Sequence, residues 1–138
     1  MPIIEFEAEL GYFLQARPSL LIRVSAGETG PWRDIWAALD TGSSHCAFSR
    51  ELASSFGVEV VDPAPERMLS PGGPVAGWFE SVCIEIPDID TILTPLVFIV
   101  DGPRNPALLG LTGVLDHLIL GLRHRESRLL LARDWVGM

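Results

Sequence analysis

The chain has no lysine and only two cysteines, and it lacks any apolar run long enough to span a membrane. Cys46 and Cys83 are too few for a disulfide framework, and neither has histidine or cysteine neighbours at the spacing of a zinc site. Acidic residues at positions 5, 7 and 9 stand where a secretion signal would carry positive charge before an apolar segment. We therefore expect reduced cysteines, no metal, no cofactor, no membrane contact and a cytoplasmic location.

Positive charge is also scarce. The chain has 18 Asp and Glu residues against ten basic residues, which gives a net charge of −8. Binding to nucleic acid requires concentrated positive charge, so the composition argues against a nucleic-acid partner. All ten basic residues are arginine, which we attribute to the base composition of the genome rather than to function.

A length of 138 residues is typical of one domain, so we treat residues 1–138 as a single unit. Apolar residues make up 48% of the chain, which is enough to bury a core. Because small domains bury a lower fraction of their surface than large ones, a partner surface should add to the stability of this one.

Alternation of apolar and polar residues dominates the sequence and predicts half-buried strands. This pattern extends over residues 4–10, 19–26, 34–40 and 81–87. Residues 96–100 are continuously apolar, as in a strand that is buried on both faces. Near the end of the chain, two apolar segments on either side of RHRES predict a closing hairpin.

Helix signals are few. Residues 49–57 (SRELASSFG) predict one short helix, with Ser49 as the N-cap and Gly57 as the terminator. Residues 111–118 (LTGVLDHL) predict a second, with Thr112 as a possible N-cap. The expected fold is therefore mostly β, a small closed barrel or folded sheet with one or two short helices.

Asp40 ends an apolar strand and enters a tight turn within the stretch WAALDTGSSHCAFS (residues 36–49). Thr41 and Gly42 supply a hydroxyl group and a residue that is free to adopt positive φ. Since Asp, Thr, Gly and Ser are all common turn residues, Asp40 could simply cap the turn. Two further motifs downstream favour a different interpretation.

Three elements occur in order along the chain. The first, AALDTGSSHCAFS (residues 37–49), resembles the active-site strand and loop of aspartic proteases. A later one, PALLGLTGVLDHLILGL (residues 106–122), resembles the second signature of these enzymes, an apolar pair followed by a glycine, here Gly110. Between them, the glycine-rich residues 68–86 occupy the place of the flap that closes over substrate. In order and spacing the elements are similar to the retropepsin-like, single-domain branch of the family, over about residues 19–131.

This resemblance implies hydrolysis of peptide bonds through an activated water. Aspartic proteases are the well-known case of two carboxyls about 3 Å apart that share one proton and act as base and acid together. The chain has one Asp-Thr-Gly and no second copy of it. The implied protein is therefore a homodimeric aspartic endopeptidase in which Asp40 of each subunit meets its copy on the two-fold axis. Its other partner would be a peptide or protein substrate.

The resemblance also implies roles for single residues. Asp40 would supply one half of the catalytic dyad, and Thr41 would link the two active-site loops across the dimer. Gly42 would donate its backbone N–H to a carboxylate oxygen, with Ser43 as a further donor behind it. Leu109 and Gly110 would pack beneath the loop.

The tip of the flap would supply backbone groups to the substrate and exclude water, and it would consist of Ser70, Pro71, Gly72, Gly73 and Pro74. Trp78 and Phe79 would either line the base of the flap or be ordinary core aromatics. We interpret His45 as a surface or capping residue rather than one that tunes the dyad.

Other functions are compatible with parts of the pattern. A catalytically silent retropepsin-fold module could dimerise or bind extended peptides, because two prolines at the flap tip remove donors and stiffen the loop. A phosphate-binding turn at DTGSS, or an Asp40 that accepts a phosphoryl group, would need further phosphate loops that the chain lacks. Ser43 or Ser44 paired with His45 as a nucleophile lacks an orienting carboxylate in the sequence.

Overall fold

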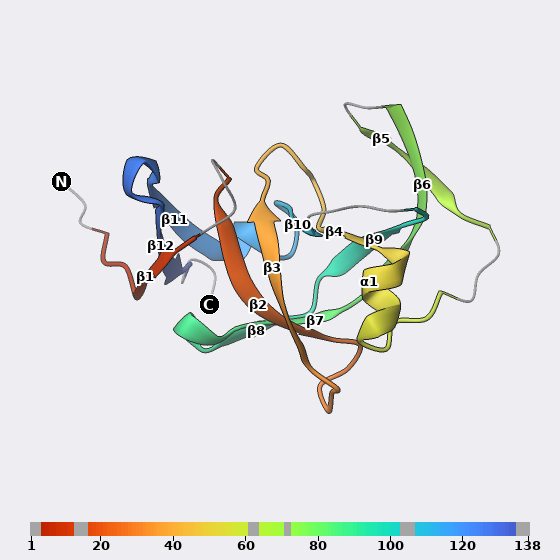
Figure 1. Ribbon diagram of the computed structural model, residues 1–138, viewed down its shortest axis with the longest axis horizontal. Helices are drawn as coiled ribbons and strands as arrows, with labels where there is room; N and C mark the ends of the chain where they lie inside the picture. Colours follow the sequence, from red (N-terminus) through yellow and green to blue (C-terminus); the bar gives the residue numbers. More distant parts are fainter. Residues whose placement is uncertain (1–3, 13–16, 61–63, 71–72, 103–106, 135–138) are drawn as a thin grey trace.

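The computed structural model describes residues 4–12, 17–60, 64–70, 73–102 and 107–134. Twelve strands dominate this part of the chain (Figure 1): β1 (Ala8–Gly11), β2 (Ser19–Ser25), β3 (Arg33–Leu39), β4 (Ala47–Ser49), β5 (Glu66–Ser70), β6 (Gly73–Ser81), β7 (Cys83–Ile86), β8 (Thr91–Leu93), β9 (Leu96–Val100), β10 (Ala107–Leu109), β11 (Leu118–Arg123) and β12 (Arg128–Arg133). The prediction of a mostly β fold is confirmed.

The strands form two sheets. The larger has nine strands in the order β5-β6-β9-β4-β10-β3-β2-β7-β8, and the smaller has three in the order β1-β12-β11. Of the two forms predicted from the sequence, the described residues do not adopt a closed barrel, because β5 and β8 end the larger sheet without pairing to each other. The hairpin that contains β5 projects away from the rest of the molecule, on the side opposite the smaller sheet (Figure 1).

The principal core lies between the two sheets. Alternate residues of β2, Ile22 and Val24, are fully buried, as the period of two predicts. They belong to the same apolar cluster as Leu129 and Leu131 of β12. Burying one side chain of this size stabilises a fold by about 1.5–3 kcal/mol. A second, smaller cluster has its own buried residues, Ala38, Ala47, Phe98, Val100 and Leu108.

The first predicted helix is present as α1 (Arg50–Ser55). The Ser49 side chain accepts a hydrogen bond from the backbone N–H of Leu52 at 3.0 Å, as expected of an N-cap. Gly57 follows the helix with a φ of +97°, a conformation that suits glycine. The capping signals in the sequence therefore located this element correctly.

The second predicted helix forms only a 3-10 turn, η2 (Leu115–His117). Thr112 is not its N-cap, because Thr112 lies in an isolated parallel bridge with His45. Gly113 then has a φ of +90°, which interrupts any continuous helical backbone. Pairing with a distant part of the chain has thus overridden the local helix signal. Two further 3-10 turns, η1 (Pro87–Ile89) and η3 (His124–Glu126), complete the described helical elements.

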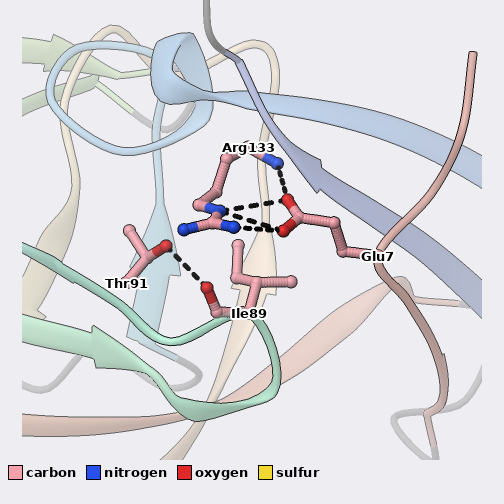
Figure 2. Close-up of polar contacts among 4 residues, drawn as sticks. All are labelled: Glu7, Ile89, Thr91 and Arg133. Atoms are coloured by element: carbon pink, nitrogen blue, oxygen red, sulfur yellow. Dashed lines mark hydrogen bonds and ion pairs between the residues drawn. The ribbon is translucent and has the colours of Figure 1, made fainter.

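The predicted closing hairpin is formed by β11, η3 and β12, and the start of the chain pairs with it. Glu7 donates its backbone N–H to the Leu131 carbonyl at 2.7 Å. The Glu7 carboxylate binds Arg133 through the guanidinium and the backbone N–H (Figure 2). The shortest of these contacts, Nη2 to Oε1, is 2.6 Å. These bonds hold the pKa of the Glu7 carboxyl below its ordinary value of 4.5.

We predict that Glu7→Gln lowers the melting temperature near neutral pH and that the difference from the wild type disappears in acid. Since the pKa of Glu7 is lowered by folding, the ion pair stabilises the fold above pH 4.5 and is lost as the pH falls through the lower, folded-state pKa. The two side chains are 35% and 30% exposed, so salt should reduce the effect. Thermal unfolding from about pH 7 to about pH 3 measures it. Glu5→Gln is the control, and an equal loss in both variants would contradict the assignment.

Candidate active site

Asp40 follows directly on β3, and β10 lies between β3 and β4 (Figure 1). β10 runs parallel to β3, with Leu109 paired to Leu39, and antiparallel to β4. It therefore separates the strand that enters the segment of residues 40–46 from the strand that leaves it. We call this segment the Asp40 loop.

The Asp40 loop is closed by backbone hydrogen bonds. The Asp40 N–H donates to the Leu109 carbonyl at 3.0 Å, and the Gly42 N–H donates to Asp40 Oδ1 at 3.0 Å. The Ser43 N–H donates to the Asp40 carbonyl at 3.1 Å, which completes a tight turn. Asp40 is half-buried, whereas Thr41 and Gly42 are exposed. The carboxylate is therefore held by backbone groups while the next two residues face solvent.

Gly110 lies against the backbone of the Asp40 loop. A Cβ atom at this position would lie 2.2 Å from the His45 carbonyl oxygen and 2.9 Å from that of Ser43. Both neighbours are backbone atoms that cannot rotate away, so only glycine fits. The structure places Gly110 beneath the loop, which is the position that the resemblance implied for it.

The two residues after Gly110 continue the contact. The Leu111 N–H donates to the Ser43 carbonyl at 2.9 Å, and the Thr112 N–H donates to the Ser44 carbonyl at 2.8 Å. Residues 110–112 thus form a backbone strap under the Asp40 loop. Because both bonds end on loop carbonyls, the strap fixes the path of the loop independently of side chains.

Cys46 lies at the junction of the loop and this strap. Its Sγ accepts a hydrogen bond from the Gly110 N–H at 3.4 Å, and burial raises the pKa of the thiol to about 11. The thiol therefore stays protonated at neutral pH and serves as a small packed group. Cys83 is also free and buried. The sequence predicted reduced cysteines but carried no signal for the contact with Gly110, which is 64 residues away.

The side chains of the loop bond mostly within it. Ser43 Oγ donates to the His45 carbonyl at 2.7 Å and so stabilises the loop in the single chain. Ser44 Oγ lies 3.1 Å from His45 Nδ1. Adjacent residues on a strand would point apart, but these two lie in a loop and can bond. In the described part of the chain no carboxylate bonds to His45, so this pair lacks the third group of a serine triad.

The β5–β6 hairpin occupies the place where the sequence predicted a flap. Its register runs from Glu66 opposite Gly77 to Ser70 opposite Gly73. Ser70, Gly73 and Pro74 lie at the ends of its strands, while Pro71 and Gly72 lie outside the described residues. Close to this end, Leu69 is 89% exposed. An apolar side chain so open to solvent is available for contact with another molecule.

Trp78 and Phe79 point to opposite faces of β6. The Phe79 ring packs edge-on against Phe98 and against His45 of the Asp40 loop, with centroid distances of 5.2 Å and 5.0 Å. Trp78 is buried on the other face under the Arg50 guanidinium, 4.9 Å from the ring centroid. Phe79 therefore joins the hairpin to the candidate site, and Trp78 packs as a core aromatic. The sequence did not distinguish these two positions, and it gave no sign that His45 contacts Phe79.

The chemistry of the candidate site in the single chain is limited because its described residues supply one carboxylate, that of Asp40. Among the described residues no second carboxylate bonds to Asp40, and no group of three or more His, Cys, Asp or Glu could hold a metal ion. One carboxylate can accept a proton from water but cannot act as base and acid in the same step. The described residues bring no second acidic group to Asp40.

We predict that Gly110→Ala destabilises the protein by about 1–3 kcal/mol, because the added Cβ meets the backbone of the Asp40 loop. Gly27→Ala is the matched control, since a Cβ there has no atom within 4 Å and should change the stability by less than about 0.5 kcal/mol. Urea unfolding measures both variants. Similar midpoints for the two would show that the loop tolerates the methyl group.

Comparisons with known proteins agree on the fold alone. No family model and no curated protein matches the sequence. Among solved structures, the chain is similar to the EIAV protease complexed with the inhibitor HBY-793, at 17% identity and a TM-score of 0.54, over 73% of this chain and 88% of that one. It is also similar to a retropepsin-like aspartic protease from Rickettsia conorii, at 17% identity and a TM-score of 0.59, over 91% and 98% of the two chains. No helix in the described residues is long and apolar enough to cross a membrane.

The similarity to these two solved structures shows that the chain has the fold of the retropepsin-like aspartic proteases, as its three sequence elements predicted.

Proposed function

We propose that the chain is a homodimeric aspartic endopeptidase whose catalytic dyad consists of Asp40 from each subunit. The observation that carries the proposal is the place of Asp40. It stands at the end of β3 in a loop held by β10 and residues 110–112, within a retropepsin-like fold. A carboxylate that only capped a turn would not need this support from β10, a strand far along the sequence.

In the proposed reaction the two carboxyls share one proton. The ionised member takes a proton from a water molecule, which attacks the peptide carbonyl carbon, and the protonated member donates to the carbonyl oxygen. The pKa values of such a pair belong to the pair and not to one residue. The Gly42 N–H, which donates to Asp40 Oδ1, would help to keep the carboxylate correctly oriented. No covalent intermediate is required.

Exposure of the loop supports the dimer. Thr41 and Gly42 are exposed, and Leu111, on the strap beneath them, is 43% exposed. In an isologous dimer each residue near the axis faces its own copy, so one exposed loop suffices to build both halves of a site. Thr41 would then bond across the axis, and Ser43 would support the loop from behind.

The β5–β6 hairpin would serve as the flap over a bound peptide. Beyond Gly77 the ladder pairing of β6 is with β5, and the links to the rest of the larger sheet include the Asp101 N–H, which donates to the Ala76 carbonyl at 2.9 Å, and the packing of Met68 and Val75 on the second apolar cluster. Closure would have to move these contacts together with the hairpin. Exposed Leu69 would find apolar contacts once the hairpin closes on substrate or on its copy. The backbone of Ser70, Gly73 and Pro74 would lie nearest the peptide, together with Pro71 and Gly72.

We predict that Asp40→Asn abolishes peptide cleavage while leaving the fold and the dimer intact, since an amide cannot take part in proton sharing. Cleavage of an unstructured protein substrate measures activity, and circular dichroism and sedimentation measure fold and assembly. Asp88→Asn, which changes an exposed carboxylate in η1, is the control and should keep full activity. Cleavage by Asp40→Asn at the wild-type rate would refute the proposed dyad.

A peptide-binding module without catalysis is the second candidate, favoured by the two prolines that the hairpin carries at positions 71 and 74. A proline offers no backbone donor to a substrate and restricts closure. On this alternative the wild type would bind extended peptides against the hairpin and release them uncut. A cytoplasmic location is part of both proposals, and cell fractionation tests it.

A further inference from the structure

The ladder pairing between β6 and β9 ends at Gly77, and beyond this residue β6 pairs with β5. From Gly77 to Ser81 β6 pairs with β9, whereas from Gly73 to Gly77 it pairs with β5. A Cβ at Gly77 would lie 2.3 Å from the Ile99 carbonyl oxygen and 2.8 Å from the Phe98 ring. The base of the hairpin is therefore pressed closely against β9, and motion of the outer part must pivot about this point.

The ring of His45 contacts β6 at Phe79, two residues from Gly77 on the side where β6 pairs with β9. His45 and Phe79 pack edge-to-face with centroids 5.0 Å apart and ring planes at 63°, and Phe79 packs on Phe98 in the same manner at 5.2 Å and 62°. Such edge-to-face pairs are attractive beyond the apolar area that they bury. The row His45–Phe79–Phe98 thus connects the Asp40 loop, the hairpin base and β9.

At its other end His45 is fixed to the Asp40 loop. Its carbonyl accepts a hydrogen bond from Ser43 Oγ at 2.7 Å, and His45 also bridges to Thr112 of the strap. The bond of 3.1 Å between Ser44 Oγ and Nδ1 sets the orientation of the ring. Because the backbone of His45 cannot shift without moving Gly110, the Asp40 loop offers Phe79 a contact whose position is fixed.

We propose that His45 is a positioning residue that couples the β5–β6 hairpin to the Asp40 loop. Its ring holds the base of the hairpin at a set distance from the Asp40 loop, so that the hairpin closes over a peptide in a fixed position relative to the carboxylate, whose own placement is set by backbone bonds. The contact with Phe79 carries this role, and the bond to Ser44 orients the ring. The functional role of this coupling rests on the proposed endopeptidase function. The contact between His45 and Phe79 can be tested without measuring that function.

Hydrogen exchange of the β5–β6 amides tests the coupling directly. His45→Ala should speed exchange in residues 66–70 and 75–79 about threefold to tenfold, while core amides of β2 and β12 stay protected. His45→Phe restores an aromatic ring and should return exchange to within about twofold of the wild type. His117→Ala, at an exposed histidine in η2, is the control. If His45→Ala does not fold, His45→Leu replaces it, and the same faster exchange of the hairpin amides is expected. Hairpin exchange at the wild-type rate in a folded variant overturns the proposal.

Kinetics on a cleavable peptide supply a second readout. His45→Ala should raise KM about threefold to tenfold and leave kcat within about twofold, because the hairpin is loosened while Asp40 keeps its backbone bonds. In Phe79→Ala the further change of His45→Ala should have no added effect, whereas additive effects would overturn the coupling. If the wild type cleaves no peptide, the endopeptidase proposal fails on its own, and the exchange experiment still decides the role of His45.

Discussion

The insertion of β10 between β3 and β4 is the constraint on which the candidate site depends. This three-residue strand pairs with both of its neighbours, and the residue after it, Gly110, lies against the backbone of the Asp40 loop and donates its N–H to Cys46 Sγ. The Leu109 carbonyl accepts the Asp40 N–H, so the acidic residue is positioned by main-chain geometry. A carboxylate held in this way needs no neighbouring side chain to keep its orientation, which leaves its outer side open to a second group.

The strands that support Asp40 and the β5–β6 hairpin differ in how much apolar packing holds them in place. The strands that support Asp40 belong to buried clusters that include Leu109 and Leu108, whereas the β5–β6 hairpin ends in a strongly exposed Leu69. Local opening costs little where few apolar groups are buried. Phe79 and His45 lie between these two regions, so we expect loss of their contact to affect the hairpin more than the core.

Much of the fold was predictable from the sequence because its signals are local. Alternation located β2, β3 and β7, and the N-cap Ser49 with Gly57 bounded α1. The same reasoning failed at residues 111–118, where the bridge between Thr112 and His45 prevails over helix propensity. It also left a closed barrel and a folded sheet as alternatives, and the barrel is not adopted by the described residues, since closure depends on which edge strands meet. Local patterns carry no information about partners that are distant in sequence.

The sequence by itself determined that Asp40 ends a strand and enters a tight turn, because an apolar run followed by Asp-Thr-Gly-Ser permits little else. It also determined that the chain supplies a single Asp-Thr-Gly, which is the reason for proposing a dimer. Only the tertiary structure decided what lies around that turn: Gly110 and Cys46 beneath it, and Phe79 against His45 beside it. These contacts join residues more than 30 positions apart, and their geometry arises from strand pairing and packing rather than from neighbouring residue types.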